Sequence, residues 1–214
     1  RNPNGTITEK TEDGENINYS YFLMATEKGI IKKTALEEYK KIRSNGLTAI
    51  KLEEGDQLTW VKPTTGNNNV VIVTADGKSV RFKESDVRPM GRSTKGVTAI
   101  KFKNPTDYVV GMGIIRDDND KLLTLSSNGY GKMTVLKEYP LQKRGGTGVF
   151  TFRVTPKTGR IASARIIEKD EEEIVVISQK AKVIRSELKA VPTLGRQTSG
   201  VKLMNMNEED SVAT

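Results

Sequence analysis

The sequence contains neither cysteine nor histidine among its 214 residues. These absences exclude a disulfide framework, a zinc finger, a thiol nucleophile, a Ser-His-Asp triad and an imidazole general base. Long apolar runs are also missing, and none approaches the roughly 18 residues that a membrane-spanning helix requires. Residues 1–5 do not have the pattern of a signal peptide. We therefore expect a cytoplasmic protein that has no membrane partner.

Positive charge is in excess, with 35 Lys and Arg residues against 27 Asp and Glu residues and a formal net charge of +8. The isoelectric point of about 9.5 predicts an anionic partner, most simply nucleic acid. An acidic protein partner and ribosomal contacts are alternatives that this charge balance leaves open.

An internal repeat gives the strongest signal about the fold. Hydroxyl residues recur at spacings of 48, 52 and 52, at Thr26, Thr74, Ser126 and Ser178. Glycines recur at spacings of 50, 52 and 52, at Gly46, Gly96, Gly148 and Gly200. We divide the chain into repeats at about 21–70, 71–121, 122–173 and 174–214, and interpret residues 1–20 as the end of a preceding blade.

Each repeat begins with a β-branched run, which is followed by a turn and a second short strand, as in a hairpin. The turns of the first three repeats fall at Gly29, Gly77 and Gly129. More strand follows the second phased glycine, as at Val97 to Phe102, so a repeat holds about four strands. A unit of about 50 residues with four strands is the size of a propeller blade. We predict an all-β ring of about four four-stranded blades, either by itself or within a six-bladed ring.

Basic residues occupy fixed positions in these repeats. Four residues past the turn lie Lys33, Arg81, Met133 and Arg185, and just before the second glycine lie Arg43, Arg92, Arg144 and Arg196. Equivalent residues of successive blades lie at equivalent places on a ring, so these charges predict a basic belt that a polyanion could follow. The alternatives are solvated side chains, or arginines that bond carbonyls in their own turns.

The stretch Gln142-Lys-Arg-Gly-Gly-Thr-Gly148 is the most specific short motif. Its three glycines allow close backbone approach and expose N–H groups, while Lys143 and Arg144 supply charge for phosphate oxygens. A flexible surface loop is the alternative. Residues 126–132 superficially resemble a P-loop, but the first glycine is absent and Met133 replaces the required Ser or Thr, so nucleotide binding is rejected there.

Acidic and aromatic residues have structural interpretations. Asp56, Asp107 and Asp210 recur in phase and are predicted to cap turns, because separate blades would keep them apart. Trp60 and the phenylalanines are expected in blade cores. A carboxylate-dependent enzyme is improbable, since no convergent acid pair is evident.

With these features the chain resembles the C-terminal domain of the A subunit of DNA gyrase and its relative in topoisomerase IV. The resemblance covers nearly the whole chain, and Gln142 to Gly148 is similar to the gyrase box Gln-Arg-Arg-Gly-Gly-Lys-Gly, with Lys143 and Thr147 replacing an Arg and a Lys. It implies a β-pinwheel that exchanges strands between blades and bends DNA around a basic rim. It also implies three partners: double-stranded DNA, the rest of the A subunit, and the B subunit, which carries the ATPase of the enzyme.

The resemblance further implies that breakage and reunion, with ATP and Mg, belong to other parts of the enzyme, so we expect no catalytic residue, metal or cofactor in this domain. We predict DNA wrapping that sets the handedness of supercoiling. The alternatives are a topoisomerase IV domain that presents DNA without chiral wrapping, and a protein-binding propeller. The predicted DNA-binding residues are Lys33, Arg43, Arg81, Arg92, Lys95, Lys132, Gln142, Lys143, Arg144, Gly145, Gly146, Gly148, Arg185 and Arg196.

Overall fold

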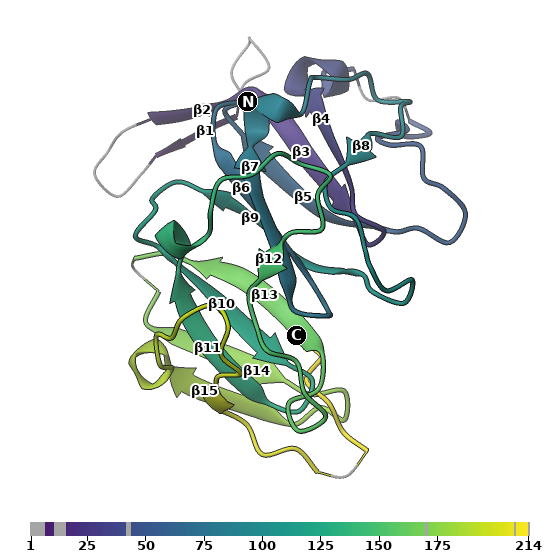
Figure 1. The fold of residues 1–214 in the computed structure, drawn as a ribbon. Helices are drawn as coiled ribbons and strands as arrows, with labels where there is room; N and C mark the ends of the chain where they lie inside the picture. The colour runs from purple at the N-terminus through teal and green to yellow at the C-terminus, as the bar shows by residue number, and fades with distance from the viewer. Residues whose placement is uncertain (1–6, 11–15, 42–43, 170, 208, 214) are drawn as a thin grey trace.

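The computed structural model describes residues 7–10, 16–41, 44–169, 171–207 and 209–213. Within these residues the structure is all-β, with three four-stranded sheets, two two-stranded sheets and four short 3₁₀ helices. No helix in these ranges is long and apolar enough to cross a membrane. Figure 1 shows the sheets following one another from β3 and β5 at the top to β14 and β15 at the bottom. The predicted all-β fold of four-stranded antiparallel sheets is confirmed.

Each repeat forms an antiparallel hairpin of its own. The hairpins are β3 (Tyr21–Thr26) with β4 (Ile30–Ala35), β6 (Asn69–Thr74) with β7 (Lys78–Lys83), β10 (Lys121–Ser126) with β11 (Tyr130–Val135), and β14 (Glu173–Ile177) with β15 (Val183–Glu187). A third strand of the same repeat pairs with the first strand of the hairpin; these strands are β5 (Leu58–Thr64), β9 (Val109–Ile115) and β13 (Ile161–Ile167). In the last repeat this pairing is the single bridge between Ser178 and Val212.

The fourth strand of each four-stranded sheet comes from the following repeat. β8 (Val97–Thr98) pairs with β4, β12 (Val149–Phe150) with β7, and β16 (Val201–Lys202) with β11. We call β8, β12 and β16 the exchange strands. Their presence confirms the strand exchange of a β-pinwheel.

A glycine precedes each exchange strand because the two backbones meet closely there. Gly148 has a φ of +68°, and a Cβ at this position would collide with the carbonyl group of Ser79 on β7. Gly96 and Gly200 make the same approach to Ile31 and Gly131. The second glycine of the repeat is thus required by strand exchange, beyond its role in a turn.

The hairpin turns share two hydrogen bonds to a hydroxyl residue in every repeat. A third bond, to an aspartate, recurs in all but the third repeat, where the Asn128 N–H donates to the Thr158 carbonyl. The Thr26 carbonyl accepts from the Gly29 N–H, and the Thr26 hydroxyl accepts from the Ile30 N–H at 3.2 Å. The Asp56 carboxylate accepts from the Lys28 N–H at 3.0 Å. Equivalent bonds recur at Thr74, Ser126 and Ser178, and at Asp107 and Asp210. The prediction that the phased aspartates cap turns is confirmed.

Three apolar clusters lie between successive hairpins and form the core. Val70 and Ile72 face the cluster shared with the first repeat, while Val71 and Val73 face the cluster shared with the third. Because successive side chains of a strand point to opposite faces, β6 needs apolar residues on both. The last hairpin has one covered face, and Val175 and Ile177 on its other face are exposed.

Short 3₁₀ helices end the second strand of each hairpin: η1 (Leu36–Tyr39), η2 (Glu84–Asp86), η3 (Leu136–Glu138) and η4 (Leu188–Ala190). In the N-terminal region, β1 (Ile7–Lys10) pairs with β2 (Asn16–Tyr19) as a separate two-stranded sheet.

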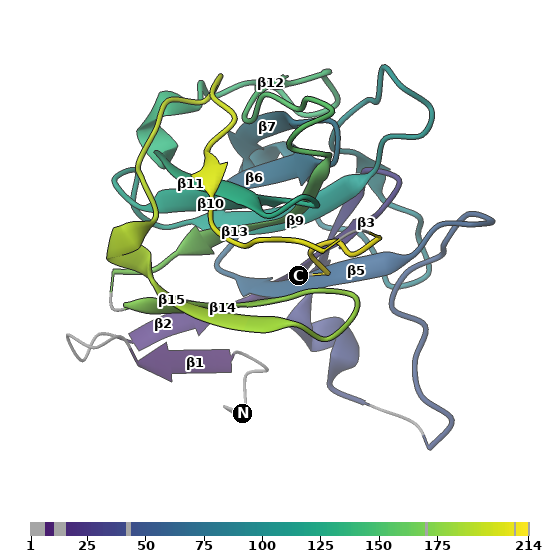
Figure 2. The ribbon, with the colours of Figure 1, turned by 90° about the horizontal axis from the view of Figure 1, so that it is seen from below.

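Contacts between neighbouring sheets show which strand of each sheet lies toward the inside of the domain and which toward the outside. β9 contacts both β5 and β13, so these three strands lie toward the inside. The exchange strands are at the opposite side of each sheet, and Figure 2 shows the order β12, β7, β6, β9 running inward from the upper edge. We call the side formed by the exchange strands and the loops joined to them the outer edge.

The turn of the last hairpin generates a prediction about stability. Ala181 has a φ of +61° where the other three repeats have glycine with φ near +80°. Since a left-handed conformation strains alanine, we expect Ala181→Gly to raise the free energy of unfolding by up to about 1 kcal/mol. Denaturant titration measures this difference. Ala190→Gly, at a position with negative φ, should lower stability, and a loss in both variants would contradict the strain.

Candidate nucleic-acid interface

The phased arginines connect neighbouring repeats along the outer edge. Nη1 of Arg92 donates to the Thr48 carbonyl at 3.3 Å, Nη1 of Arg144 to the Thr98 carbonyl at 3.1 Å, and Nη1 of Arg196 to the Phe150 carbonyl at 3.0 Å. Each acceptor lies two residues after the second glycine of the preceding repeat. Nε of Arg144 also donates to the Asp86 carbonyl, at 2.9 Å. The alternative that these arginines bond carbonyls is therefore correct, although the carbonyls belong to another repeat. Arg43 lies outside the described residues.

Three predicted phosphate contacts are buried, and the structure assigns them structural roles instead. Lys33 is 4% exposed and Lys132 is inaccessible to solvent, while Arg81 is 6% exposed. They lie on β4, β11 and β7, the second strands of their hairpins. Lys33 and Arg81 occupy equivalent positions, as their spacing in the sequence predicted, but at these two positions the side chain faces the interior.

The buried cations neutralise acids or hold loops. Nζ of Lys33 donates to the Glu84 carbonyl at 3.1 Å and lies 3.7 Å from the Glu84 carboxylate. Arg81 donates to the Asp118 carboxylate at 2.6 Å. Nζ of Lys132 donates to the carbonyls of Gly195 and Arg196, at 2.6 and 2.9 Å. Lys132 thus lies directly beneath the loop that carries Arg196.

Burial lowers the pKa of Lys132 to about 8, because the surrounding protein disfavours the charged ammonium; nearby Glu138 raises it and Arg196 lowers it. Lys32 occupies the same position in the first repeat. It donates to the carbonyls of Ala49 and Arg92, and burial lowers its pKa too. The second repeat has the apolar Val80 there, so its sheet holds the next loop without a lysine.

That next loop is the motif from Gln142 to Gly148, and backbone bonds fix it against the exchange strand of the second repeat. The Gly145 N–H donates to the Ala99 carbonyl at 2.6 Å, and the Gly146 carbonyl accepts from the Lys101 N–H at 2.9 Å. The Gln142 N–H donates to the Arg81 carbonyl at 2.7 Å. Lys143 is exposed. The motif is an ordered part of the outer edge, unlike the flexible loop considered as its alternative.

Two other predicted residues are exposed but paired with acids. Lys95 lies 2.8 Å from the Glu53 carboxylate. Arg185 forms an ion pair with Glu173 across the last hairpin. Both ion pairs are solvent-exposed, where such pairs contribute little stability and exchange readily for other anions.

The sequence interpretation missed a second basic series, five residues after the second glycine of each repeat. It consists of Lys51, Lys101 and Arg153, with Asn205 in the last repeat. The backbone N–H groups of the three cations donate to the carbonyls of Thr94, Gly146 and Thr198, which are equivalent positions of the following repeat. All three side chains are exposed and form no ion pair within the described part of the chain. The same spacing argument that found the arginines could have found them.

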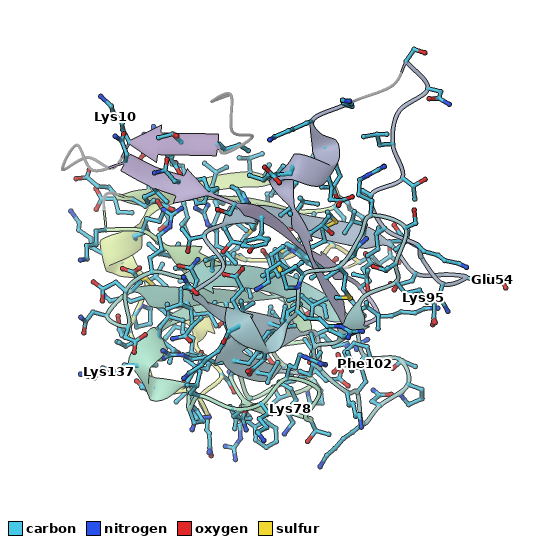
Figure 3. The ribbon with its side chains drawn as sticks, turned by 90° about the horizontal axis from the view of Figure 1, so that it is seen from above. Lys10, Glu54, Lys78, Lys95, Phe102 and Lys137 are labelled. Carbon is cyan, nitrogen blue, oxygen red and sulfur yellow. The ribbon has the colours of Figure 1, made fainter. Side chains whose placement is uncertain are left out.

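The outer edge therefore presents free cations at backbone-fixed, repeating positions, which we name the edge cations: Lys51, Lys101 and Arg153. Figure 3 shows Lys78 and Phe102 at this side of the molecule and Lys10 at the opposite side. Elsewhere among the described residues, no cluster of acidic side chains is placed to hold a metal ion.

These features define a propeller-like domain of strand-exchanged blades. A family model described as the DNA gyrase C-terminal domain, a beta-propeller, matches residues 20–65, 68–116, 120–168 and 172–214. The chain belongs to this family. The DNA gyrase A protein of Ureaplasma parvum is 40% identical over 92% of this chain, and that of Deinococcus deserti is 42% identical over 89%. The chain spans about a quarter of the length of these relatives, 23% and 24%.

Solved structures of the family have the same fold. The C-terminal domain of a DNA topoisomerase IV superposes with a TM-score of 0.85 at 26% identity, covering 94% of this chain and 64% of that one. A DNA gyrase A C-terminal domain gives a TM-score of 0.80 at 26% identity, covering 93% and 68%. Both branches of the family are therefore close in structure to this chain.

The buried ammonium of Lys132 generates a prediction about pH. Its pKa is about 8 in the folded protein and ordinarily 10.5, so between these values the unfolded chain binds more protons and raising the pH stabilises the folded state. Lys132→Met removes this effect together with two hydrogen bonds. We expect the stability advantage of the wild type over Lys132→Met to grow from about pH 7 to about pH 10, reaching about 1–3 kcal/mol. Denaturant titrations at both pH values measure it, and an advantage independent of pH would contradict it.

Proposed function

We propose that this chain binds duplex DNA along its outer edge and bends it, as the DNA-wrapping domain of a DNA gyrase A protein. The observation that carries the proposal is the series of edge cations. Their backbones are fixed by the same bond in three successive repeats, and their charged groups are exposed and unpaired within the described ranges. A regular row of free cations on a convex protein edge suits a polyanion of regular spacing.

Phosphate contacts with such a surface can supply the free energy that DNA bending requires. Smooth bending of about 20–30 bp by about 40–90° costs on the order of 1–6 kcal/mol, which several phosphate contacts can offset. The edge cations lie on loops and irregular strand, without the helix or ribbon that reads base edges in the major groove, so we expect weak sequence preference overall. Lys143 extends the row, and the guanidinium groups of Arg144 and Arg196 adjoin it, as does that of Arg92, which lies 3.9 Å from the Glu38 carboxylate.

In the complete enzyme we propose that the domain acts in the cytoplasm beside the ATPase B subunit, which supplies the energy, while the rest of the A subunit breaks and rejoins the DNA that the domain presents. ATP and Mg would act in those other parts. The motif from Gln142 to Gly148 favours gyrase, whose box it resembles. A topoisomerase IV domain that holds DNA without chiral wrapping is the second candidate, favoured by the TM-score of 0.85.

Replacement of the edge cations tests the DNA path. We expect the combined variant Lys51→Glu, Lys101→Glu and Arg153→Glu to lose at least about tenfold in affinity for duplex DNA, because three phosphate contacts become repulsions. The combined variant Lys10→Glu, Lys62→Glu and Arg165→Glu has the same total change in charge at exposed positions away from this edge and should bind far better; Lys62 and Arg165 lie on β5 and β13, at the ends of their sheets opposite the exchange strands. Titrations of labelled duplex measure both. Equal losses would contradict a defined path and favour nonspecific attraction.

The salt dependence of the wild type gives a second measure in the same assay. If about six phosphates are neutralised, the logarithm of the affinity should fall with the logarithm of the salt concentration with a slope near about −5. A flat dependence would overturn the proposal and favour a propeller that binds protein.

The handedness of DNA wrapping distinguishes the two proposed roles, that of a gyrase domain and that of a topoisomerase IV domain. We expect that ligating a nicked circular plasmid with this chain present at low salt will shift its linking number in one direction, increasingly with protein concentration. The shift is measured on gels after the protein is removed. Salt-dependent binding without a shift would contradict chiral wrapping by this chain and favour the role of a topoisomerase IV domain.

A further inference from the structure

One phenylalanine departs from the expectation that all of them belong to blade cores. Phe150, on the exchange strand β12, is 49% exposed, whereas Phe82 and Phe152 are buried. At the equivalent position, two residues after the second glycine, the other repeats have Thr48, Thr98 and Lys202. The outer edge therefore presents an aromatic ring at one repeat, where the other repeats have polar or charged side chains.

The ring lies among cations. Nζ of Lys78, its pairing partner on β7, lies 3.2 Å from the centre of the Phe150 ring. Lys103 is close enough to Lys78 to lower the pKa of that lysine, after the larger effect of burial. Neither lysine forms an ion pair within the described residues. Figure 3 shows Lys78 at the side that also carries Phe102.

The strand that carries the ring is held in place. The Phe150 carbonyl accepts from Nη1 of Arg196, and the nearby Gly148 packs against the backbone of Ser79. Because this backbone is held by hydrogen bonds and close packing, it is not displaced when its exposed side chain packs against a ligand. The backbone that carries the ring is thus fixed, and the ring itself is apolar and accessible at the middle of a surface proposed to follow DNA.

We propose that Phe150 is a wedge site for duplex DNA, which inserts its ring partly between two base pairs of the wrapped segment. Apolar wedges of this kind unstack a base step and kink the duplex, and pyrimidine–purine steps such as TpA yield most easily. In the free protein Lys78 covers one face of the ring. When DNA binds, its side chain can move so that the ammonium group contacts a phosphate beside the kink. The inference rests on the proposed function, because it requires DNA on the outer edge.

The wedge gives an otherwise sequence-neutral edge a fixed point. DNA bound along the edge cations should place its most deformable step at β12, so the position of wrapping along a sequence is biased without base-edge hydrogen bonds. We expect duplexes with one central TpA step to bind about threefold more tightly than duplexes whose central steps are stiff, the factor that corresponds to about 0.7 kcal/mol.

The test places 2-aminopurine, whose fluorescence rises when it unstacks, in the central TpA step of a duplex long enough to reach all three edge cations. Saturating wild-type protein at low salt should raise the fluorescence. Phe150→Ala should abolish the rise and the preference for TpA while keeping the salt-dependent binding, and Phe150→Trp should keep the rise. Thermal unfolding of each variant without DNA verifies that it is folded.

The matched control is Tyr108→Ala. Tyr108 is also an exposed aromatic residue, at 41%, with the Arg160 guanidinium 5.0 Å from its ring centre, but it precedes the inner strand β9. This variant should keep the fluorescence rise. A folded Phe150→Ala variant that also keeps it, or a wild type that binds without any rise, overturns the wedge and leaves the proposed function standing. Absence of salt-dependent binding by the wild type overturns the proposed function itself.

Discussion

The exchange of one short strand between successive repeats is the constraint on which the rest of the structure depends. Each four-stranded sheet is completed only when the following repeat lays two residues along its second strand. The contact is so close that a glycine must begin it, as Gly148 does against Ser79. Burial of both faces then follows for the second and third hairpins, because each of them is packed between two neighbours.

The same exchange builds the basic edge. The strand that crosses to the preceding sheet continues as a loop, and the following repeat fixes that loop through a carbonyl that bonds the N–H of Lys51, Lys101 or Arg153. The phased arginines add a bond from each loop to the strand before it. Spacing of the charges is therefore set by the backbone, and the charged groups themselves need no partner within the protein.

The sequence allowed the hairpins, their turns and the number of repeats to be predicted, because Thr26, Gly29 and Asp56 each serve a local bond that recurs in phase. It did not allow the direction of a side chain to be predicted. Lys33 and Arg185 share a phase, yet the first is buried between two sheets and the second is exposed on a hairpin with one open face. The apolar character of Phe150 predicts a place in the core, and only its position on a two-residue edge strand reveals its exposure.

Because a sheet borrows its outer strand from the next repeat, the unit that is repeated in the sequence and the unit that folds are offset by one strand. A repeat cut out at its sequence borders would leave the preceding sheet without an edge and would carry away a strand with nothing to pair with. A duplicated repeat, by contrast, would be tied to both neighbours as soon as it was inserted. Such an architecture can change its number of blades, and with it the length of its outer edge, in whole steps without redesigning any contact.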